Sequence, residues 1–154
     1  GNMATALISG LINSDQDASK IIASSPEQEH LEKLSKGFGI KTTNNNLEVV
    51  DIADIVILAV KPNIVQAVID EIKDVATYKD ILIISIAAGV KIEKIESQLG
   101  STMRVIRAMP NTPASVGAGI TAIYADEEIP KQKTEYCVDL LKAVGEVIML
   151  RLHS

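Results

Sequence analysis

The sequence predicts an α/β protein with a doubly wound, mostly parallel sheet of the Rossmann type. Segments with strand character alternate with segments of helical spacing along nearly the whole chain, which is the pattern of βαβ units. Residues 54–60 and 81–86 are continuous apolar runs rich in β-branched side chains. Such runs suit central parallel strands, because helices cover both of their faces.

The most detailed local prediction concerns the second helix. Ser25 is expected to be its N-cap, Pro26 its first residue and Gln28 the third position of a capping box, with Gly37 and Gly39 at its end. The other expected helices are at 4–12, 47–52, from Pro62 to about 72, 92–99 and 131–144. The other expected strands are at 20–23, 40–43, 103–109, 120–124 and 147–150.

Composition excludes several functions. The chain has 154 residues, enough for one domain, and its net charge of −5 without a Lys/Arg cluster argues against a nucleic-acid partner. The absence of a long apolar run and of a basic leader predicts a cytoplasmic protein with no membrane span. Cys137 is the only cysteine, and its apolar helical surroundings favour a core position over a nucleophile. His30 and His153 are too far apart in the chain to suggest a metal site.

The first chemical motif is the N-terminal run Gly1, Asn2, Met3 and Ala4, which leads directly into a helix. In a dinucleotide fold, glycines let the backbone approach the pyrophosphate, and a small third residue lets the helix pack closely. The strand expected before this turn is not in the sequence. Gly1 is equally compatible with a residue left by cloning, and Ala4 with an ordinary helix position.

The second motif is Ser24-Ser25, which follows the next strand. A carboxylate near this position usually binds the ribose 2′-hydroxyl of NAD and repels a 2′-phosphate. Hydroxyl groups here favour NADPH over NADH as cofactor. The alternative is that Ser25 only caps its helix, and both roles are compatible.

Three further strand ends complete the predicted site. They are Ala59, Val60, Lys61 and Pro62, then Ala87, Ala88 and Gly89, and finally Met109, Pro110 and Asn111. Ligands of open α/β sheets bind beyond the carboxyl ends of strands, so these turns are well placed to line a cofactor. Each turn alone is also compatible with a plain junction between elements, which is the commoner meaning of a Lys-Pro pair; together the strand ends predict a site.

In order, Gly-Asn-Met-Ala, Leu-Ala-Val-Lys-Pro, Ala-Ala-Gly-Val and Arg-Ala-Met-Pro-Asn-Thr-Pro resemble the pyrroline-5-carboxylate reductase family from Gly1 to about Ile148. The resemblance implies reduction of 1-pyrroline-5-carboxylate to proline with NAD(P)H. It also implies Asn2 to Ala4 at the pyrophosphate, Ser24 and Asn46 at the adenosine end, and Met109 to Asn111 nearest the nicotinamide. No catalytic residue is nominated, because hydride transfer to a protonated C=N bond depends mainly on positioning.

Compared with the family, the sequence lacks the first strand and the helical C-terminal dimerisation domain, and residues 149–154 form an atypical tail after the domain at 1–148. We therefore expect a fragment with little or no activity, and a homo-oligomer for the full-length enzyme. Another segment is expected to fill the gap in the sheet, with a second copy of the chain as one possible source and the tail strand as a less favoured candidate. The alternatives are a stand-alone NADP-binding module without catalysis and another imine or 3-oxoacid reductase of the same fold.

Overall fold

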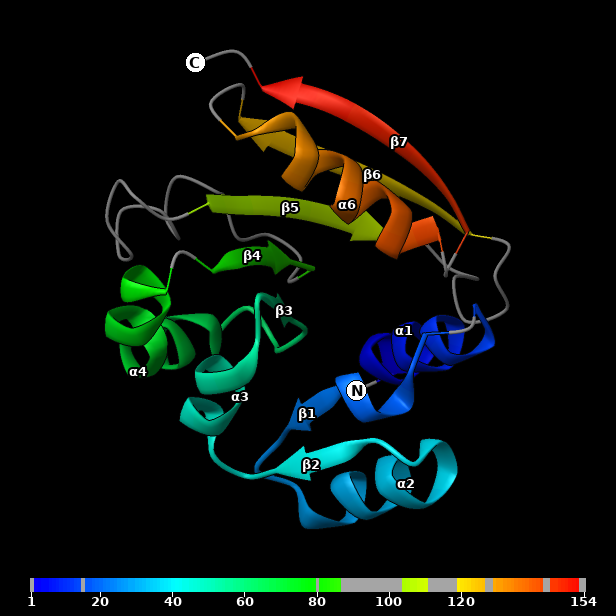
Figure 1. Ribbon diagram of the computed structural model, residues 1–154, viewed down its shortest axis with the longest axis vertical. Helices are drawn as coiled ribbons and strands as arrows, with labels where there is room; N and C mark the ends of the chain where they lie inside the picture. The colour runs from blue at the N-terminus through cyan, green and yellow to red at the C-terminus, as the bar shows by residue number, and fades with distance from the viewer. Residues whose placement is uncertain are drawn as a thin grey trace.

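The computed structural model describes residues 2–14, 16–79, 81–86, 104–110, 119–126, 129–142 and 145–152 (Figure 1). Helices and strands alternate along these residues, as the sequence predicts. The helices are α1 (Asn2–Asn13), the 3-10 turn η1 (Ala18–Lys20), α2 (Gln28–Phe38), α3 (Asn46–Ile52), α4 (Val65–Tyr78) and α6 (Lys131–Leu141). The strands are β1 (Ile22–Ser24), β2 (Lys41–Thr43), β3 (Ile55–Leu58), β4 (Leu82–Ser85), β5 (Arg104–Pro110), β6 (Gly119–Asp126) and β7 (Gly145–Leu152).

The described strands form two sheets. β1 and β2 make a parallel two-stranded sheet, and the other strands make a five-stranded sheet in the order β3-β4-β5-β6-β7. All neighbours in the larger sheet are parallel except β5 and β6, where Arg107 lies opposite Tyr124 in antiparallel register. In Figure 1 the smaller sheet lies with α2 at the lower end of the molecule. The fold is thus the expected α/β class with a mostly parallel sheet, but the sheet is divided.

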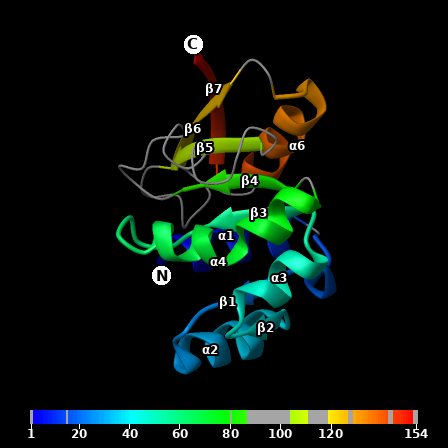
Figure 2. The same ribbon diagram turned by 90° about the vertical axis from the view of Figure 1, so that its left-hand side faces the viewer.

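The larger sheet carries a hydrophobic core on each face. On one face Ile83 and Val105 pack with Ile69 and Ile72 of α4. The opposite face, which includes Ile84, is covered by residues of α1 and α6. Every residue of β4 is buried, which confirms the prediction from its continuous apolar run. Figure 2 shows strands β3 to β7 in turn from the middle of the molecule to its upper end.

Helix α1 packs against both sheets. Leu7 belongs to the core that contains Leu82 of β4, whereas Ile8 belongs to a separate cluster with Leu34 of α2 and Ile40. Neighbouring positions on one helix therefore face different sheets. Among the described strands, β1 pairs only with β2 and β3 only with β4, so α1 joins two sheets whose facing strands share no ladder.

Several element boundaries differ from the sequence predictions. β1 begins at Ile22 because η1 precedes it, with the Asp17 carboxylate accepting from the Ser19 backbone N–H at 2.9 Å. α4 begins at Val65 because a turn comes first, in which Ile64 N–H donates to the Lys61 carbonyl at 2.9 Å. α6 ends at Leu141. β7 runs to Leu152, through the first residues of the expected tail, and the expected helix at 92–99 lies outside the described residues.

Candidate functional site

Two of the predicted site residues meet at the carboxyl end of β1. Ser24 is the last residue of that strand, and Asn46 is the first residue of α3. The Ser24 hydroxyl donates to Oδ1 of Asn46 at 2.7 Å, and both side chains are half-buried. The fold therefore brings together residues 22 positions apart that the sequence analysis assigns to the adenosine end of a cofactor.

One carboxylate contacts this pair, and a second is hydrogen-bonded to the neighbouring strand β2. Nδ2 of Asn46 donates to Oε2 of Glu71 on α4 at 3.5 Å. On β2, the Thr43 hydroxyl donates to the Glu48 carboxylate of α3. Among the described residues, no Lys or Arg side chain is hydrogen-bonded to Ser24 or Asn46. Glu71 has no place in the sequence prediction, because a contact between residues 25 positions apart depends on how α3 and α4 pack.

Ser25 does not cap α2 as predicted. The helix begins at Gln28, and its N-cap is Glu27, whose side chain makes no capping bond. The Ser25 hydroxyl instead accepts from the Glu27 backbone N–H at 3.1 Å. Because Pro26 has no N–H, the serine closes a short turn one step before the helix. The capping box is therefore wrong, but Ser25 still stands at the entrance of α2.

The beginnings of α1 and α2 lie side by side. Oγ1 of Thr5 is 3.4 Å from Nε2 of His30, and each residue lies near the start of its helix. The backbone of Asn2, Met3 and Ala4 forms the first turn of α1, whose N–H groups have no intrahelical acceptor. A phosphate-sized anion at this turn would gain those donors and the helix dipole. Gly1 lies outside the described residues.

The chain after β3 gives a second strand end. Ala59 and Val60 are half-buried, whereas Lys61 and Pro62 are exposed in the turn that leads to α4. Lys61 makes no ion pair within the described part of the chain. A ligand at this turn would meet backbone and apolar side chains, because the charge of Lys61 lies at the exposed surface.

The β5 end presents an apolar surface. Met109 is 40% exposed on β5, and the backbone of Pro110 pairs with Thr121 of β6. An exposed methionine at a strand end suits contact with a flat ring. Ala87, Ala88, Gly89 and Asn111 lie outside the described residues, so their predicted roles stay predictions.

Comparison with known proteins identifies the family. A family model described as "NADP oxidoreductase coenzyme F420-dependent" matches residues 1–89. The chain belongs to this oxidoreductase family. The match includes α1, the Ser24–Asn46 pair and the turn after β3, which are the parts assigned above to a dinucleotide.

Proteins named pyrroline-5-carboxylate reductase match almost the whole chain. The one from Pseudomonas aeruginosa is 39% identical over 150 residues, which are 97% of this chain and 55% of that protein. The solved structure from Coxiella burnetii is 39% identical, with a TM-score of 0.94, over 97% of this chain and 56% of that one. The Plasmodium falciparum structure, with NADP bound, is 27% identical with a TM-score of 0.84, over 97% of this chain and 54% of that one. The predicted resemblance is confirmed, and the chain spans about half the length of these relatives.

The larger sheet has a polar cluster that faces its α4 side. Ser85 of β4 lies opposite Arg107 of β5, which in turn lies opposite Tyr124 of β6. The Arg107 guanidinium is 5.9 Å from the centre of the Tyr124 ring. Ser85 Oγ and Arg107 Nε are buried and find no partner in the described part of the chain.

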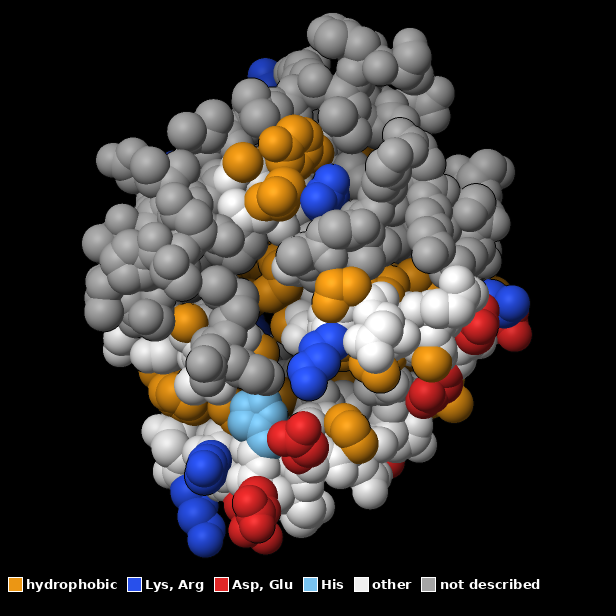
Figure 3. Space-filling view, turned by 180° about the vertical axis from the view of Figure 1, so that it is seen from behind, with side chains coloured by type: hydrophobic (Ala, Val, Ile, Leu, Met, Phe, Trp, Pro, Cys, Tyr) orange, Lys and Arg blue, Asp and Glu red, His pale blue; other side chains and the backbone are white. Residues whose placement is uncertain are grey.

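Cys137 lies in the core, as the sequence predicts. Its side chain is fully buried on α6, and burial raises the pKa of the thiol to about 12, so the thiol stays protonated at neutral pH. No group of metal-ligating side chains occurs among the residues described. Within the same residues, no helix is long and apolar enough to cross a membrane. Figure 3 shows basic and acidic side chains interspersed on one face, without a continuous basic area.

Proposed function

We propose that this chain is the NADPH-binding part of an enzyme that reduces 1-pyrroline-5-carboxylate to L-proline. The observation that carries the proposal is the Ser24–Asn46 hydrogen bond at the carboxyl end of β1. Two polar side chains at a strand end support this assignment, because dinucleotides bind beyond the carboxyl ends of strands in open α/β sheets. The similarity to pyrroline-5-carboxylate reductases supports the substrate.

The remainder of the cofactor would follow the other strand ends. Asn2, Met3 and Ala4 supply helix N–H groups to the pyrophosphate. Ala59 to Pro62 and Ala87 to Gly89 line the path of the dinucleotide, and Met109, Pro110 and Asn111 adjoin the nicotinamide. Half-buried Ala59 and exposed Met109 fit this route, because small and apolar groups allow a flat ligand to come close.

The preference for NADPH is proposed on hydrogen-bonding grounds. Ser25 Oγ uses a lone pair to accept from Glu27, so its own proton is available to a 2′-phosphate. The first N–H groups of α2 add donors beside it. No carboxylate occupies the usual NAD-binding position at the end of β1, where Ser24 stands.

The nicotinamide would supply the hydride, and the residues of this chain would hold it in place. A protonated C=N bond is already electrophilic, so correct positioning of the two rings provides most of the rate. We therefore assign no general acid or base to this chain. Residues beyond this half would complete the substrate site and the dimer, and a cytoplasmic location is proposed for the whole enzyme.

The unpaired edges of β1 and β3 lead to a proposal about association. Each strand has one hydrogen-bonding side without a partner among the described strands. β7, the tail strand, pairs with β6 at the far edge of the larger sheet. We propose that the 154-residue chain fills the gap by exchanging a strand with a second copy, and light scattering across a concentration series tests this. A monomer at every concentration would contradict it.

The function is tested in two stages. Calorimetric titration of the 154-residue chain with NADPH and NADH should show binding of both, with NADPH tighter. Proline formation from 1-pyrroline-5-carboxylate should be weak or absent with this chain alone, and present with the natural polypeptide that contains it. Failure of that polypeptide to form proline would refute the substrate assignment.

A further inference from the structure

Two hydrogen bonds in series connect the smaller sheet to a helix that packs on the larger sheet. They run from Ser24 on β1 through Asn46 on α3 to Glu71 on α4. Ser24 and Asn46 belong to the proposed cofactor site. Glu71 is exposed and is not assigned to that site, but it contacts Asn46 directly.

The Glu71 carboxylate fixes which group donates in each of these hydrogen bonds. An ionised carboxylate can only accept hydrogen bonds, so Asn46 presents its Nδ2 group to Glu71. Oδ1 of Asn46 is then directed to Ser24 and accepts the serine proton at 2.7 Å. The single hydroxyl proton of Ser24 is engaged in this hydrogen bond, so only the oxygen lone pairs remain for a ligand.

We propose that Glu71 is a positioning residue that limits the preference for NADPH by keeping Ser24 a hydrogen-bond acceptor. This inference rests on the proposed function. The 2′-hydroxyl of NADH can donate to Ser24, whereas the 2′-phosphate of NADPH carries only acceptors near neutral pH. Ser24 therefore favours NADH, Ser25 favours NADPH, and the balance between them sets the cofactor ratio.

Loss of the Glu71 acceptor should release Asn46. The amide can then turn its Nδ2 group toward Ser24, whose proton becomes free for a 2′-phosphate. A gained donor bond is worth about a three- to tenfold change in binding. We therefore expect Glu71→Ala to strengthen binding of the phosphorylated ligand relative to the unphosphorylated one.

The test uses two fragments of the cofactor, 2′,5′-ADP and 5′-AMP, which differ in the 2′-phosphate. Calorimetry gives their affinity ratio for the parent chain, Glu71→Ala and Glu71→Gln. The alanine variant should raise the ratio in favour of 2′,5′-ADP by about three- to tenfold. The glutamine variant should raise the ratio less than the alanine variant, because its amide oxygen still accepts from Asn46, although its NH2 group no longer enforces the direction that the carboxylate imposes.

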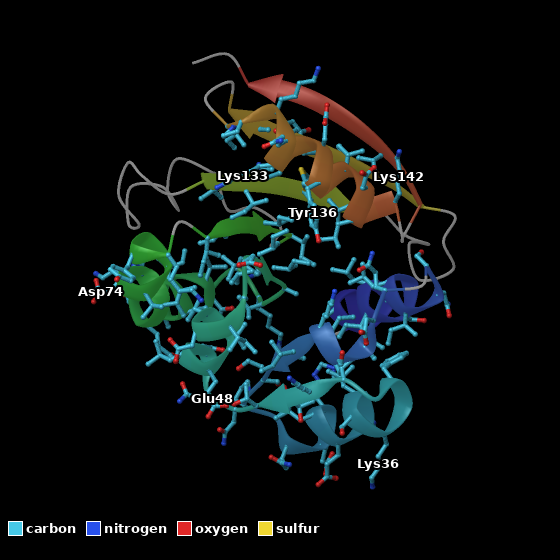
Figure 4. All side chains as sticks on the ribbon, in the orientation of Figure 1. Lys36, Glu48, Asp74, Lys133, Tyr136 and Lys142 are labelled. Atoms are coloured by element: carbon cyan, nitrogen blue, oxygen red, sulfur yellow. The ribbon has the colours of Figure 1, made fainter. Side chains whose placement is uncertain are left out.

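Asp74→Ala is the matched control, because Asp74 is an exposed acid one turn further along α4 and points outward in Figure 4. It should leave the ratio unchanged. An unchanged ratio in Glu71→Ala, or an equal rise in Glu71→Gln or Asp74→Ala, would overturn the inference and leave the proposed function standing. A parent chain that binds neither fragment would overturn both.

Discussion

Lys79 donates from Nζ to the backbone carbonyl of Val50 at 2.9 Å, and it also contacts the carbonyl of Asp51. The lysine follows α4, and the two carbonyls belong to the last turn of α3, where helix carbonyls have no intrahelical donor. A cation at a helix C-terminus is also favoured by the helix dipole. Lys79 therefore fixes α3, and with it Asn46, against α4.

Replacement of Lys79 should loosen this arrangement. We expect Lys79→Met to lower the free energy of unfolding by about 1–2 kcal/mol, because two carbonyls lose a charged donor. Urea denaturation measures the change. Lys33→Met, at an exposed position on α2, is the control and should stay within about 0.5 kcal/mol of the parent. Equal effects of the two substitutions would contradict the role of Lys79.

Removal of the Ser25 hydroxyl should affect one cofactor more than the other. Ser25→Ala is expected to weaken NADPH binding by about three- to tenfold with a smaller change for NADH, because only NADPH carries the 2′-phosphate that the hydroxyl would bind. Titration calorimetry measures both affinities. Ser25→Thr keeps the hydroxyl and should bind like the parent. A larger loss for NADH would refute the assignment of Ser25.

The buried thiol of Cys137 should resist chemical labelling. A thiol reagent at pH 8 should react far more slowly with the native chain than with the chain unfolded in urea, because the native pKa is about 12. Rapid stoichiometric labelling of the native chain would show that Cys137 is accessible.

The same shift predicts a pH dependence of stability. The pKa of the Cys137 thiol is raised in the folded state above the ordinary value of 9.0. The contribution of Cys137 to the free energy of unfolding is therefore complete below about pH 9 and is lost as the pH rises toward about 12. Denaturation curves from pH 8 to pH 10.5 should show a smaller decline for Cys137→Ala than for the parent. Identical slopes would contradict the shift.

Mutations at Leu7 and Ile8, two neighbouring positions on α1, should affect different sheets. Leu7→Ala and Ile8→Ala should each cost about 2–4 kcal/mol, because both side chains are buried. Hydrogen exchange should differ between them, with faster exchange in β4 for Leu7→Ala and in β2 for Ile8→Ala. The same exchange pattern in both variants would contradict the bridging role of α1.

Much of this fold could be predicted from local pattern. The apolar run at 81–86 specified a buried strand, and Gly39 was expected at the end of α2, where it has a φ of 69°. Ser24 and Asn46 were placed in one site by strand position and resemblance, and the structure joins them by a hydrogen bond. These features depend on short stretches of sequence or on a motif that is complete in the chain.

What the sequence did not predict depends on distant partners. The antiparallel direction of β6 beside β5 leaves no mark on the apolar pattern of either strand. α2 begins later than predicted because the Ser25 hydroxyl accepts from the N–H of Glu27, before the helix, and not from an N–H of the helix itself. Sequence pattern does not distinguish between donors so close together. Glu71 was missed because charged residues on exposed helix faces are common, and only the packing of α3 on α4 makes this one significant.

Because the strands form two separate sheets, the proposed cofactor would contact both sheets and hold them together. Its adenosine end would rest on the smaller sheet at Ser24, while its nicotinamide would rest on the larger sheet at Met109. A molecule bound in this way would resist any force that pulls the sheets apart. The chain should therefore become mechanically stiffer across the junction when the dinucleotide is bound, with the seam between β1 and β3 as the place where the empty protein yields first.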